Sequence, residues 1–357
     1  MPERAVDPTN LLERLNHVRG IAQDLYVSLM IYVGRRLGLY DALRGAGPLD
    51  SEALAARTGL HERWLREWLR GQAAAGLIDY GDGRFELSLE AAAVLTDEDH
   101  LMFLGHIFDS IPHRAEIIQR LPEAFRTGLG LSWDDRGEGS IQSTESTFRN
   151  WYRHVLVPAA LPLLDGVVPR LQAGAQVADL GCGTGVALIE MAKAFPRSHF
   201  HGYEISEQSL ARADENRAAA RTRNAHLHNL RVEPLPGDAG FDLITTFDCL
   251  HDMTDPEKQA AVPIRAALKP DGVWFIVDID GGATFEENLQ KPAAAMLYAM
   301  SVLSCMSSSL SEPGAEGLGT LGLPEPALRE LVRVAGFTRF RRLNLRHPMN
   351  AYYEVRP

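Results

Sequence analysis

The sequence lacks a cysteine framework. Its 357 residues contain three cysteines, Cys182, Cys249 and Cys305, which lie far apart and form no C-x-x-C pair. Neither a disulfide scaffold nor a zinc site built from cysteine pairs is therefore indicated.

Positive charge is also scarce. Lysine and arginine total 36 against 47 aspartates and glutamates, which gives a formal net charge of −11. Proteins that bind nucleic acid through its phosphates need a basic surface. We therefore expect no nucleic acid as the main partner.

Long apolar runs are missing as well. The longest, residues 293–306, contains Ser301 and Ser304 and is too short to span a bilayer. The first residues, Met1 to Arg4, lack the basic-then-apolar pattern of a secretory signal. We expect a soluble, cytoplasmic protein with no membrane partner, and its length favours two domains.

The most informative stretch is residues 177–185, VADLGCGTG, where a short apolar strand precedes Gly181, Gly183 and Gly185. A helical pattern begins directly afterwards, so backbone can approach a ligand at a helix N-terminus. Dinucleotide-binding proteins space their glycines as G-x-G-x-x-G, which differs from this pattern. Asp179, two residues before the first glycine, suits a cationic ligand better than a pyrophosphate. A turn that merely packs the helix on the strand is the alternative.

Residues 199–204 predict a second strand that ends in Glu204, about 20 residues past the glycines. An acid in this position can accept hydrogen bonds from two ribose hydroxyls, although a surface glutamate at a strand end is the alternative. Asp179 and the three glycines match the acid-x-G-x-G-x-G form of motif I at every position. On these residues the chain resembles the class I S-adenosylmethionine (SAM) methyltransferases, which implies SAM as the cofactor.

The N-terminal part predicts a winged helix-turn-helix. Helices are indicated at 9–44, 49–60 and 61–76, followed by a hairpin at 77–87. Residues 26–43 are apolar on most sides, so a partner subunit or the core of this domain must cover them. Residues 1–115 contain 12 arginines, no lysine and 17 aspartates and glutamates, which gives a net charge of −5. This charge argues against DNA binding by this domain. The domain resembles the winged-helix-like domain through which small-molecule methyltransferases dimerise.

Residues 116–170 are expected to form a helical linker. Trp133, Phe148 and Tyr152 in this segment, and Met300 further along the chain, are candidates to cover the substrate pocket. A solvent loop with a linker helix packed on the core is the alternative.

From residue 176 on, predicted strands alternate with helices. We expect strands at 176–180, 199–203, 225–229, 241–247, 273–279, 338–346 and 351–355, with helices at 210–221, 258–268, 286–310 and 325–334. This pattern predicts an α/β fold with a Rossmann-like, doubly wound, mostly parallel sheet and an antiparallel last strand. We expect a winged-helix-like domain at 1–115, the linker at 116–170 and a SAM-binding domain at 171–357.

Residues at the ends of two further strands are expected to contact the cofactor. The family presents an adenine contact after the third strand, where Asn229 is the matching residue, although it can equally cap a turn. Phe247 and Asp248 end the fourth strand, whose carboxyl end faces the SAM methyl group in this fold.

Residues 250–255, LHDMTD, resemble the segment that carries the general-base histidine of plant-type small-molecule O-methyltransferases. The resemblance implies that His251 is the base, with Asp252 beside it. A base with a pKa near ~6.5 helps because a phenol, with a pKa near ~10, is mostly protonated at neutral pH. In the plant enzymes two acids support the histidine, and the candidates here are Asp278 or Asp280, together with Glu316.

His251 has two other interpretations. It could be a structural histidine bonded to backbone, or it could hold a metal with Asp252, as in certain methyltransferases of 2-oxo acids. A metal needs further ligands, and residues 298–310 offer Ser301, Ser304 and Cys305 where a second histidine would be expected. No metal is therefore expected.

The resemblance covers nearly the whole chain and looks closest to an actinobacterial-type branch of the two-domain methyltransferases. It implies a homodimer that methylates a small, aromatic hydroxylated metabolite. A C-methyltransferase of a 2-oxo acid and a SAM-binding winged-helix regulator without enzymatic activity are the alternatives.

Overall fold

The computed structural model describes residues 6–357, so the segment from Met1 to Arg4 lies outside the described residues. The chain divides into two compact units, one that ends at Pro112 and one that begins at His113. The residues that the sequence assigns to a linker, 116–170, belong to the second unit.

The first unit is a winged helix-turn-helix preceded by a long helix. Its elements are α1 (Pro8–Arg36), α2 (Leu39–Leu43), α3 (Ser51–Thr58), α4 (Glu62–Ala74), β1 (Asp79–Gly81), β2 (Arg84–Glu86), α5 (Leu89–Leu95) and α6 (Gly105–Asp109). Asp50 caps α3 by accepting the Ala53 N–H (2.8 Å). Asp82 and Gly83 in the β1–β2 turn have positive φ (50° and 79°), as a tight hairpin requires. The predicted order of helix, helix and hairpin is confirmed.

The second unit is built on a seven-stranded sheet with the order β5-β4-β3-β6-β7-β9-β8. The strands are β3 (Gln176–Leu180), β4 (His199–Glu204), β5 (Ala225–Asn229), β6 (Phe241–Phe247), β7 (Leu268–Ile279), β8 (Arg339–Arg342) and β9 (Asn350–Arg356). All neighbouring strands are parallel except for β9, which is antiparallel to β7 and β8. The predicted doubly wound sheet with an antiparallel ending is confirmed.

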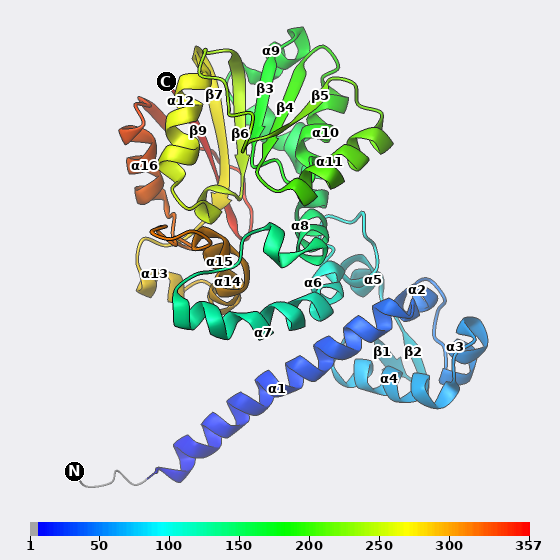
Figure 1. Ribbon diagram of the computed structural model, residues 1–357. Coiled ribbons are helices and arrows are strands. Elements are labelled where there is room, and N and C mark those ends of the chain that lie inside the picture. Colours follow the sequence, from blue (N-terminus) through cyan, green and yellow to red (C-terminus); the bar gives the residue numbers. More distant parts are fainter. Residues whose placement is uncertain (1–5) are drawn as a thin grey trace. The chain divides into compact units, whose positions relative to one another are not determined.

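Helices cover both faces of this sheet (Figure 1). They are α9 (Val167–Ala173), α10 (Val186–Ala194), α11 (Glu207–Ala220), α12 (Val262–Ala267) and α16 (Glu325–Val334). The other helices that follow α6 are α7 (Ile111–Thr127), α8 (Glu138–Trp151), α13 (Phe285–Leu289), α14 (Ala294–Met300) and α15 (Met306–Ser309). Because side chains alternate along a strand, Val177 and Leu243 face a core shared with α9 and α10, whereas Ala178 and Ile244 face one shared with α12 and α16. Both faces are closed, so a ligand is expected at the carboxyl ends of the strands.

Several predicted elements differ from the structure. The helix expected at 9–44 is divided into α1 and α2, and the strand expected at 273–279 begins at Leu268. The strand expected at 338–346 ends at Arg342. The helix expected at 286–310 is broken into α13, α14 and α15, with a π-helical turn, Ser301–Cys305, joining the last two. Pro292 lies in the gap between α13 and α14, where its missing backbone N–H and its ring disfavour a continuous helix.

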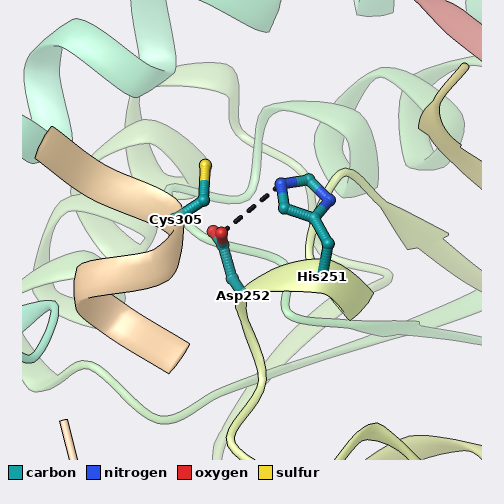
Figure 2. A group of neighbouring side chains, drawn as sticks. All are labelled: His251, Asp252 and Cys305. Atoms are coloured by element: carbon teal, nitrogen blue, oxygen red, sulfur yellow. Dashed lines mark ion pairs between the residues drawn. The ribbon is translucent and has the colours of Figure 1, made fainter. Parts of the chain in front are cut away.

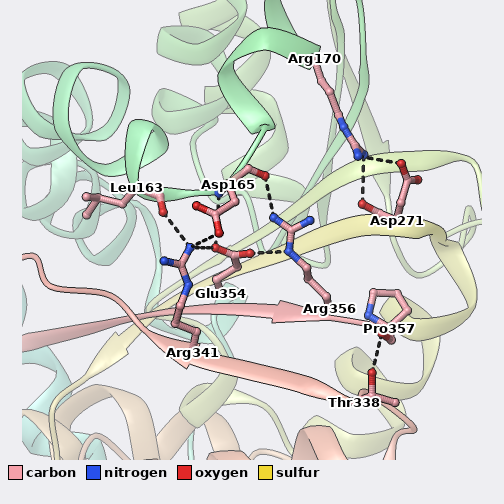
Figure 3. Close-up of polar contacts among 9 residues, drawn as sticks. All are labelled: Leu163, Asp165, Arg170, Asp271, Thr338, Arg341, Glu354, Arg356 and Pro357. Atoms are coloured by element: carbon pink, nitrogen blue, oxygen red, sulfur yellow. Dashed lines mark hydrogen bonds and ion pairs between the residues drawn. The ribbon is translucent and has the colours of Figure 1, made fainter.

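A buried acid ties the last strand to the segment before the sheet (Figure 3). Glu354 on β9 is 4% exposed and pairs with Arg341 and Arg356. Arg341 also donates to the Leu163 carbonyl (3.0 Å), and Arg356 donates to the Asp165 carbonyl (2.6 Å). Both arginine side chains therefore have acceptors, as guanidinium groups packed around a buried carboxylate need.

Within residues 6–357, no single helix has the length and apolar character that a membrane crossing needs. One bent pair, residues 138–163 with Val167–Ala173, passes that test by length and composition alone.

Candidate functional site

The loop between β3 and α10 forms the base of the site. Gly181, Gly183 and Gly185 have positive φ (74°, 53° and 72°), a conformation that favours glycine. A Cβ on Gly181 would lie 2.9 Å from Cys249 Sγ, whereas a Cβ on Gly183 would meet nothing within 4 Å. Gly183 therefore leaves backbone open to a ligand just before α10 begins.

Asp179 is buried on β3 with one carboxylate oxygen unpaired. Its Oδ1 accepts from Thr245 Oγ1 (2.7 Å), whereas Oδ2 has no hydrogen-bond partner. Burial raises the pKa of Asp179 to about 7, against the lowering effect of the Thr245 hydrogen bond. A buried orphan oxygen is costly unless a donor reaches it, so this carboxylate fits a positively charged ligand group.

Glu204 ends the neighbouring strand β4 and is bonded to the same loop. Its Oε2 accepts the N–H of Gly183 (2.9 Å), and its Oε1 accepts those of Ile205 (2.8 Å) and Ser206 (2.9 Å). Burial raises the pKa of Glu204, while the three N–H groups act in the opposite direction. The structure therefore brings the acid expected for the ribose to the middle glycine of the loop.

The third strand end carries a turn cap. Asn229 ends β5, and its Oδ1 accepts the N–H of Arg231 (3.0 Å). Arg231 in turn donates from Nε to the carbonyl of Ile205 (3.0 Å). The amide oxygen expected to accept from adenine is thus already engaged in a local hydrogen bond.

The fourth strand end is strained. Asp248, directly after β6, has a φ of 49°, which is unfavourable for a residue other than glycine and is typical of functional sites. Burial raises the pKa of Asp248 to about 8, and the nearby Asp278 adds to this effect. Phe247 packs against the ring of Tyr152, with centroids 5.5 Å apart.

His251 lies in a single 3₁₀ turn, η4 (Leu250–Asp252), after β6 and is 2% exposed. Its Nδ1 lies 2.5 Å from Oδ1 of Asp278 on β7, and its Nε2 lies 3.4 Å from Oδ1 of Asp252 (Figure 2). Burial by itself lowers the pKa of His251, but Asp278 and Asp252 raise it, and the net direction is well above the ordinary value. A ring whose Nδ1 donates to Asp278 presents Nε2 as its proton acceptor.

Cys305 completes this group from the turn between α14 and α15. The ligand atoms of His251, Asp252 and Cys305 lie within 4.8 Å of one another, and Figure 2 shows the three side chains converging. Burial raises the pKa of the Cys305 thiol, and Asp252 raises it further. One nitrogen, one oxygen and one sulfur could hold a divalent metal. Cys305 is thus a possible ligand where the sequence pattern predicts a second histidine for a metal site.

The other acids considered for His251 are placed differently. Asp280 pairs with Arg342 (2.9 Å). Glu316 is exposed, and its backbone N–H donates to the carbonyl of Thr254 (3.2 Å). Asp278 and Asp252 are therefore the carboxylates that the structure brings to His251.

Two of the aromatic residues expected to cover the pocket pack together. The rings of Phe148 and Tyr152 have centroids 6.0 Å apart. Burial raises the pKa of Tyr152 well above its ordinary value, and the charges of Asp179 and Asp248 raise it further. Met300, at the end of α14, is half-buried.

The third aromatic residue, Trp133, lies against Arg136. The guanidinium carbon is 3.8 Å from the ring centroid, and Arg136 is 3% exposed. Burial lowers the pKa of Arg136, whereas the nearby Asp252 and Cys305 raise it. Arg136 thus lies beside the His251 group. The sequence did not single it out, because one arginine in a polar segment carries no local sign of burial.

Known families and proteins resemble both units. A methyltransferase domain matches residues 171–312, and an Rv2258c-like winged HTH domain matches residues 26–97. The mitomycin biosynthesis 6-O-methyltransferase of Streptomyces lavendulae is 26% identical over 79% of this chain and 80% of its own length. An acetylserotonin O-methyltransferase of Mus musculus molossinus is 26% identical over 94% of this chain and 86% of its own.

A solved structure agrees in fold over the full length. The crystal structure of human N-acetylserotonin methyltransferase in complex with SAM has a TM-score of 0.68 at 17% identity, covering 100% of this chain and 99% of that one. At this identity the likeness concerns the fold alone.

Proposed function

Because this chain is a two-domain class I SAM-dependent methyltransferase, we propose that it methylates a hydroxyl oxygen of a small aromatic acceptor, with His251 as the general base. The observation that carries the proposal is the buried group around His251. Asp278 binds Nδ1 of the ring, and Nε2 is left facing Asp252 and Cys305.

The residues of the glycine loop fit SAM. Glu204, held beside Gly183, is the acceptor proposed for the ribose hydroxyls, and the unpaired Oδ2 of Asp179 suits the ammonium group. Phe247 and Asp248 border the same site from β6. Bound SAM supplies an electrophilic methyl group on a sulfonium, a chemistry that needs chiefly an aligned nucleophile.

His251 makes that nucleophile available. A phenol with a pKa near ~10 holds its proton at neutral pH, so its oxygen must lose the proton as it gains the methyl group. Nε2 takes this proton, and the imidazolium that forms is stabilised by the carboxylates of Asp278 and Asp252. Trp133, Phe148, Tyr152 and Met300 are proposed to hold the acceptor ring.

A matched pair of acceptors tests this proposal. The protein is incubated with SAM and a set of simple phenols, and in parallel with the methyl ethers of the same phenols. Demethylated SAM is expected to accumulate with a phenol and not with its ether, because the ether oxygen has no proton for His251 to remove. Equal accumulation with both compounds would show that the hydroxyl is not the acceptor.

The position of Cys305 favours one second candidate, a metal-assisted C-methylation of a 2-oxo acid. His251, Asp252 and Cys305 would hold the metal through atoms that lie within 4.8 Å of one another. Removal of metal decides between the two candidates. Treatment with EDTA is expected to leave O-methylation of a phenol unchanged. A loss of turnover that added divalent metal restores, with a 2-oxo acid as acceptor, would replace the base mechanism.

We also propose that the chain forms a homodimer through α1. Residues 6–26 are exposed within their unit, and the apolar side chains there include Leu11 (58% exposed), Val18 (60%) and Leu25 (59%). Leu11, Leu15, Val18, Ala22 and Leu25 recur at alternating spacings of four and three residues, which is the seam of a two-helix packing. A second copy of the same helix offers a matching seam, so a symmetric pair would cover this apolar face.

The dimer has a simple hydrodynamic test. The full chain is expected to sediment with twice the monomer mass of 39.4 kDa. Val18→Glu puts a charge into the seam and should give the monomer mass with an unchanged helical spectrum, because Val18 is exposed within its own unit. Asn16→Glu adds the same charge on the opposite face and should leave the dimer intact. A wild-type monomer at micromolar concentration contradicts the proposal.

A further inference from the structure

Arg136 is a buried cation on a firmly held turn. It ends η1 (Asp134–Arg136) and is 3% exposed. Asp134 accepts from Ser206 Oγ (2.6 Å), and Asp135 accepts from Ser132 Oγ (2.6 Å), so both preceding side chains anchor the turn. The backbone of Arg136 is therefore held in place by contacts that do not involve its guanidinium.

One edge of this guanidinium is unpaired. Nη1 donates to Ser304 Oγ, but Nε and Nη2 are buried and have no hydrogen-bond partner. No ion pair joins Arg136 to a carboxylate anywhere in residues 6–357, the part of the chain that the structure describes. The Trp133 ring covers the group at 3.8 Å and keeps water from it.

Another arginine of this chain uses the same two donors, Nε and Nη2, to bind a carboxylate. Arg35, whose side chain is 10% exposed, donates from Nε to Oδ1 of Asp109 (2.8 Å) and from Nη2 to Oδ2 (2.6 Å). Two parallel N–H groups of a guanidinium match the two oxygens of a carboxylate. Nε and Nη2 of the buried Arg136 have lost their hydration without gaining hydrogen-bond acceptors, and a ligand carboxylate would supply two.

The empty edge lies near the group proposed to remove the proton. Ser304, which accepts from Arg136, is adjacent in the chain to Cys305, whose Sγ belongs to the His251 group. The charge of Asp252 also acts on Arg136. Arg136 and the His251 group therefore both border the π-helical turn Ser301–Cys305.

We propose that Arg136 binds a carboxylate of the methyl acceptor through Nε and Nη2, so that the acceptor is a hydroxylated aromatic carboxylic acid. The inference rests on the proposed function, because it makes the same pocket hold the hydroxyl at His251 and the carboxylate at Arg136. Trp133 then lies over the ion pair and excludes solvent from it. Ser304 fixes the rotation of the guanidinium.

Calorimetry on the full chain with demethylated SAM bound tests the inference without any turnover. The probes are 2-, 3- and 4-hydroxybenzoate and the three matching hydroxybenzamides, which keep the shape and remove the charge. At least one acid is expected to bind about 10- to 100-fold more tightly than its amide, because a bidentate charged pair replaces neutral hydrogen bonds. Equal binding of every acid and its amide to the wild type overturns the proposal.

Variants assign that preference to Arg136. Arg136→Met should abolish it while demethylated SAM binds as before, and Arg136→Lys should keep part of it, because lysine keeps the charge and loses the paired geometry. Arg149→Met removes an arginine that pairs with Glu145 (2.8 Å) and should leave the preference intact. A preference that survives Arg136→Met assigns the carboxylate to another residue and overturns the proposal. If the hydroxybenzoate binds through Arg136 but is not methylated, the proposed O-methylation is wrong, whereas the carboxylate site at Arg136 stands.

Removal of the charge also separates a binding role from a structural one. Arg136→Met is expected to unfold at the same temperature as the wild type or higher, because the wild type buries donors without partners. If Arg136→Met lowers the unfolding temperature clearly and still binds the acid more tightly than the amide, Arg136 stabilises the fold and does not bind the acceptor.

Discussion

His251→Ala is expected to turn over its acceptor roughly 10² to 10⁴ times more slowly than the wild type. The variant loses the group that takes the hydroxyl proton, whereas the glycine loop and Glu204 are untouched, so SAM affinity should change little. Turnover is measured with a saturating phenol, and SAM binding is measured by calorimetry. If both alanine substitution and chelation leave turnover unaffected, His251 is structural and the base mechanism is wrong.

The pH dependence of the same reaction follows from the environment of His251. Only the neutral ring can accept a proton, so the rate should rise with pH and level off above the pKa of His251. Because Asp278 and Asp252 raise that pKa, the midpoint should lie above the ordinary value of about 6.5. Asp278→Asn keeps an acceptor for Nδ1 but removes the charge, so its midpoint should move to lower pH. An acceptor that is already ionised would show no such rise.

Glu204→Ala is expected to weaken SAM binding by roughly 10²- to 10⁴-fold. Hydrogen bonds to a charged group contribute about 1.5–3 kcal/mol each, and the variant loses the acceptor proposed for two ribose hydroxyls. It also leaves the N–H groups of Gly183, Ile205 and Ser206 without their carboxylate. Glu207→Ala removes an exposed acid at the start of α11 and should bind SAM normally.

A second change at the loop separates ligand binding from general damage. Gly183→Val places a side chain in the open space beside the loop at a φ of 53°, where a branched residue is strained. It should therefore weaken SAM binding without removing any carboxylate. Tight binding of SAM that survives both Glu204→Ala and Gly183→Val would place the cofactor elsewhere.

The sheet could be predicted from the sequence because its signals are local. Alternating and continuous apolar runs marked the strands, and β3, β5 and β6 begin and end at the predicted residues. The spacing of Gly181, Gly183 and Gly185 fixed the loop, since only such residues accept its positive φ without strain. His251 could be named because it lies shortly after the end of β6 in a recognisable segment.

The acceptor side of the site could not be predicted in the same way. Arg136, Cys305 and His251 come from three separated parts of the chain, and their proximity depends on how η1 and the α14–α15 segment pack. Residues 286–310 read as one helix because their apolar spacing continues past Pro292. The choice among Asp278, Asp280 and Glu316 likewise needed the positions of the side chains, because each is an acid near a strand end or in a loop.

Single-turnover transfer from SAM with a labelled methyl group tests the central claim most directly. The purified full chain is mixed with labelled SAM and hydroxybenzoate after EDTA treatment, and the product is fragmented to locate the label. The account predicts label on the phenolic oxygen, formed rapidly by the wild type and roughly 10² to 10⁴ times more slowly by His251→Ala. Label on carbon or on the carboxylate, or equal rates for the two proteins, would contradict it.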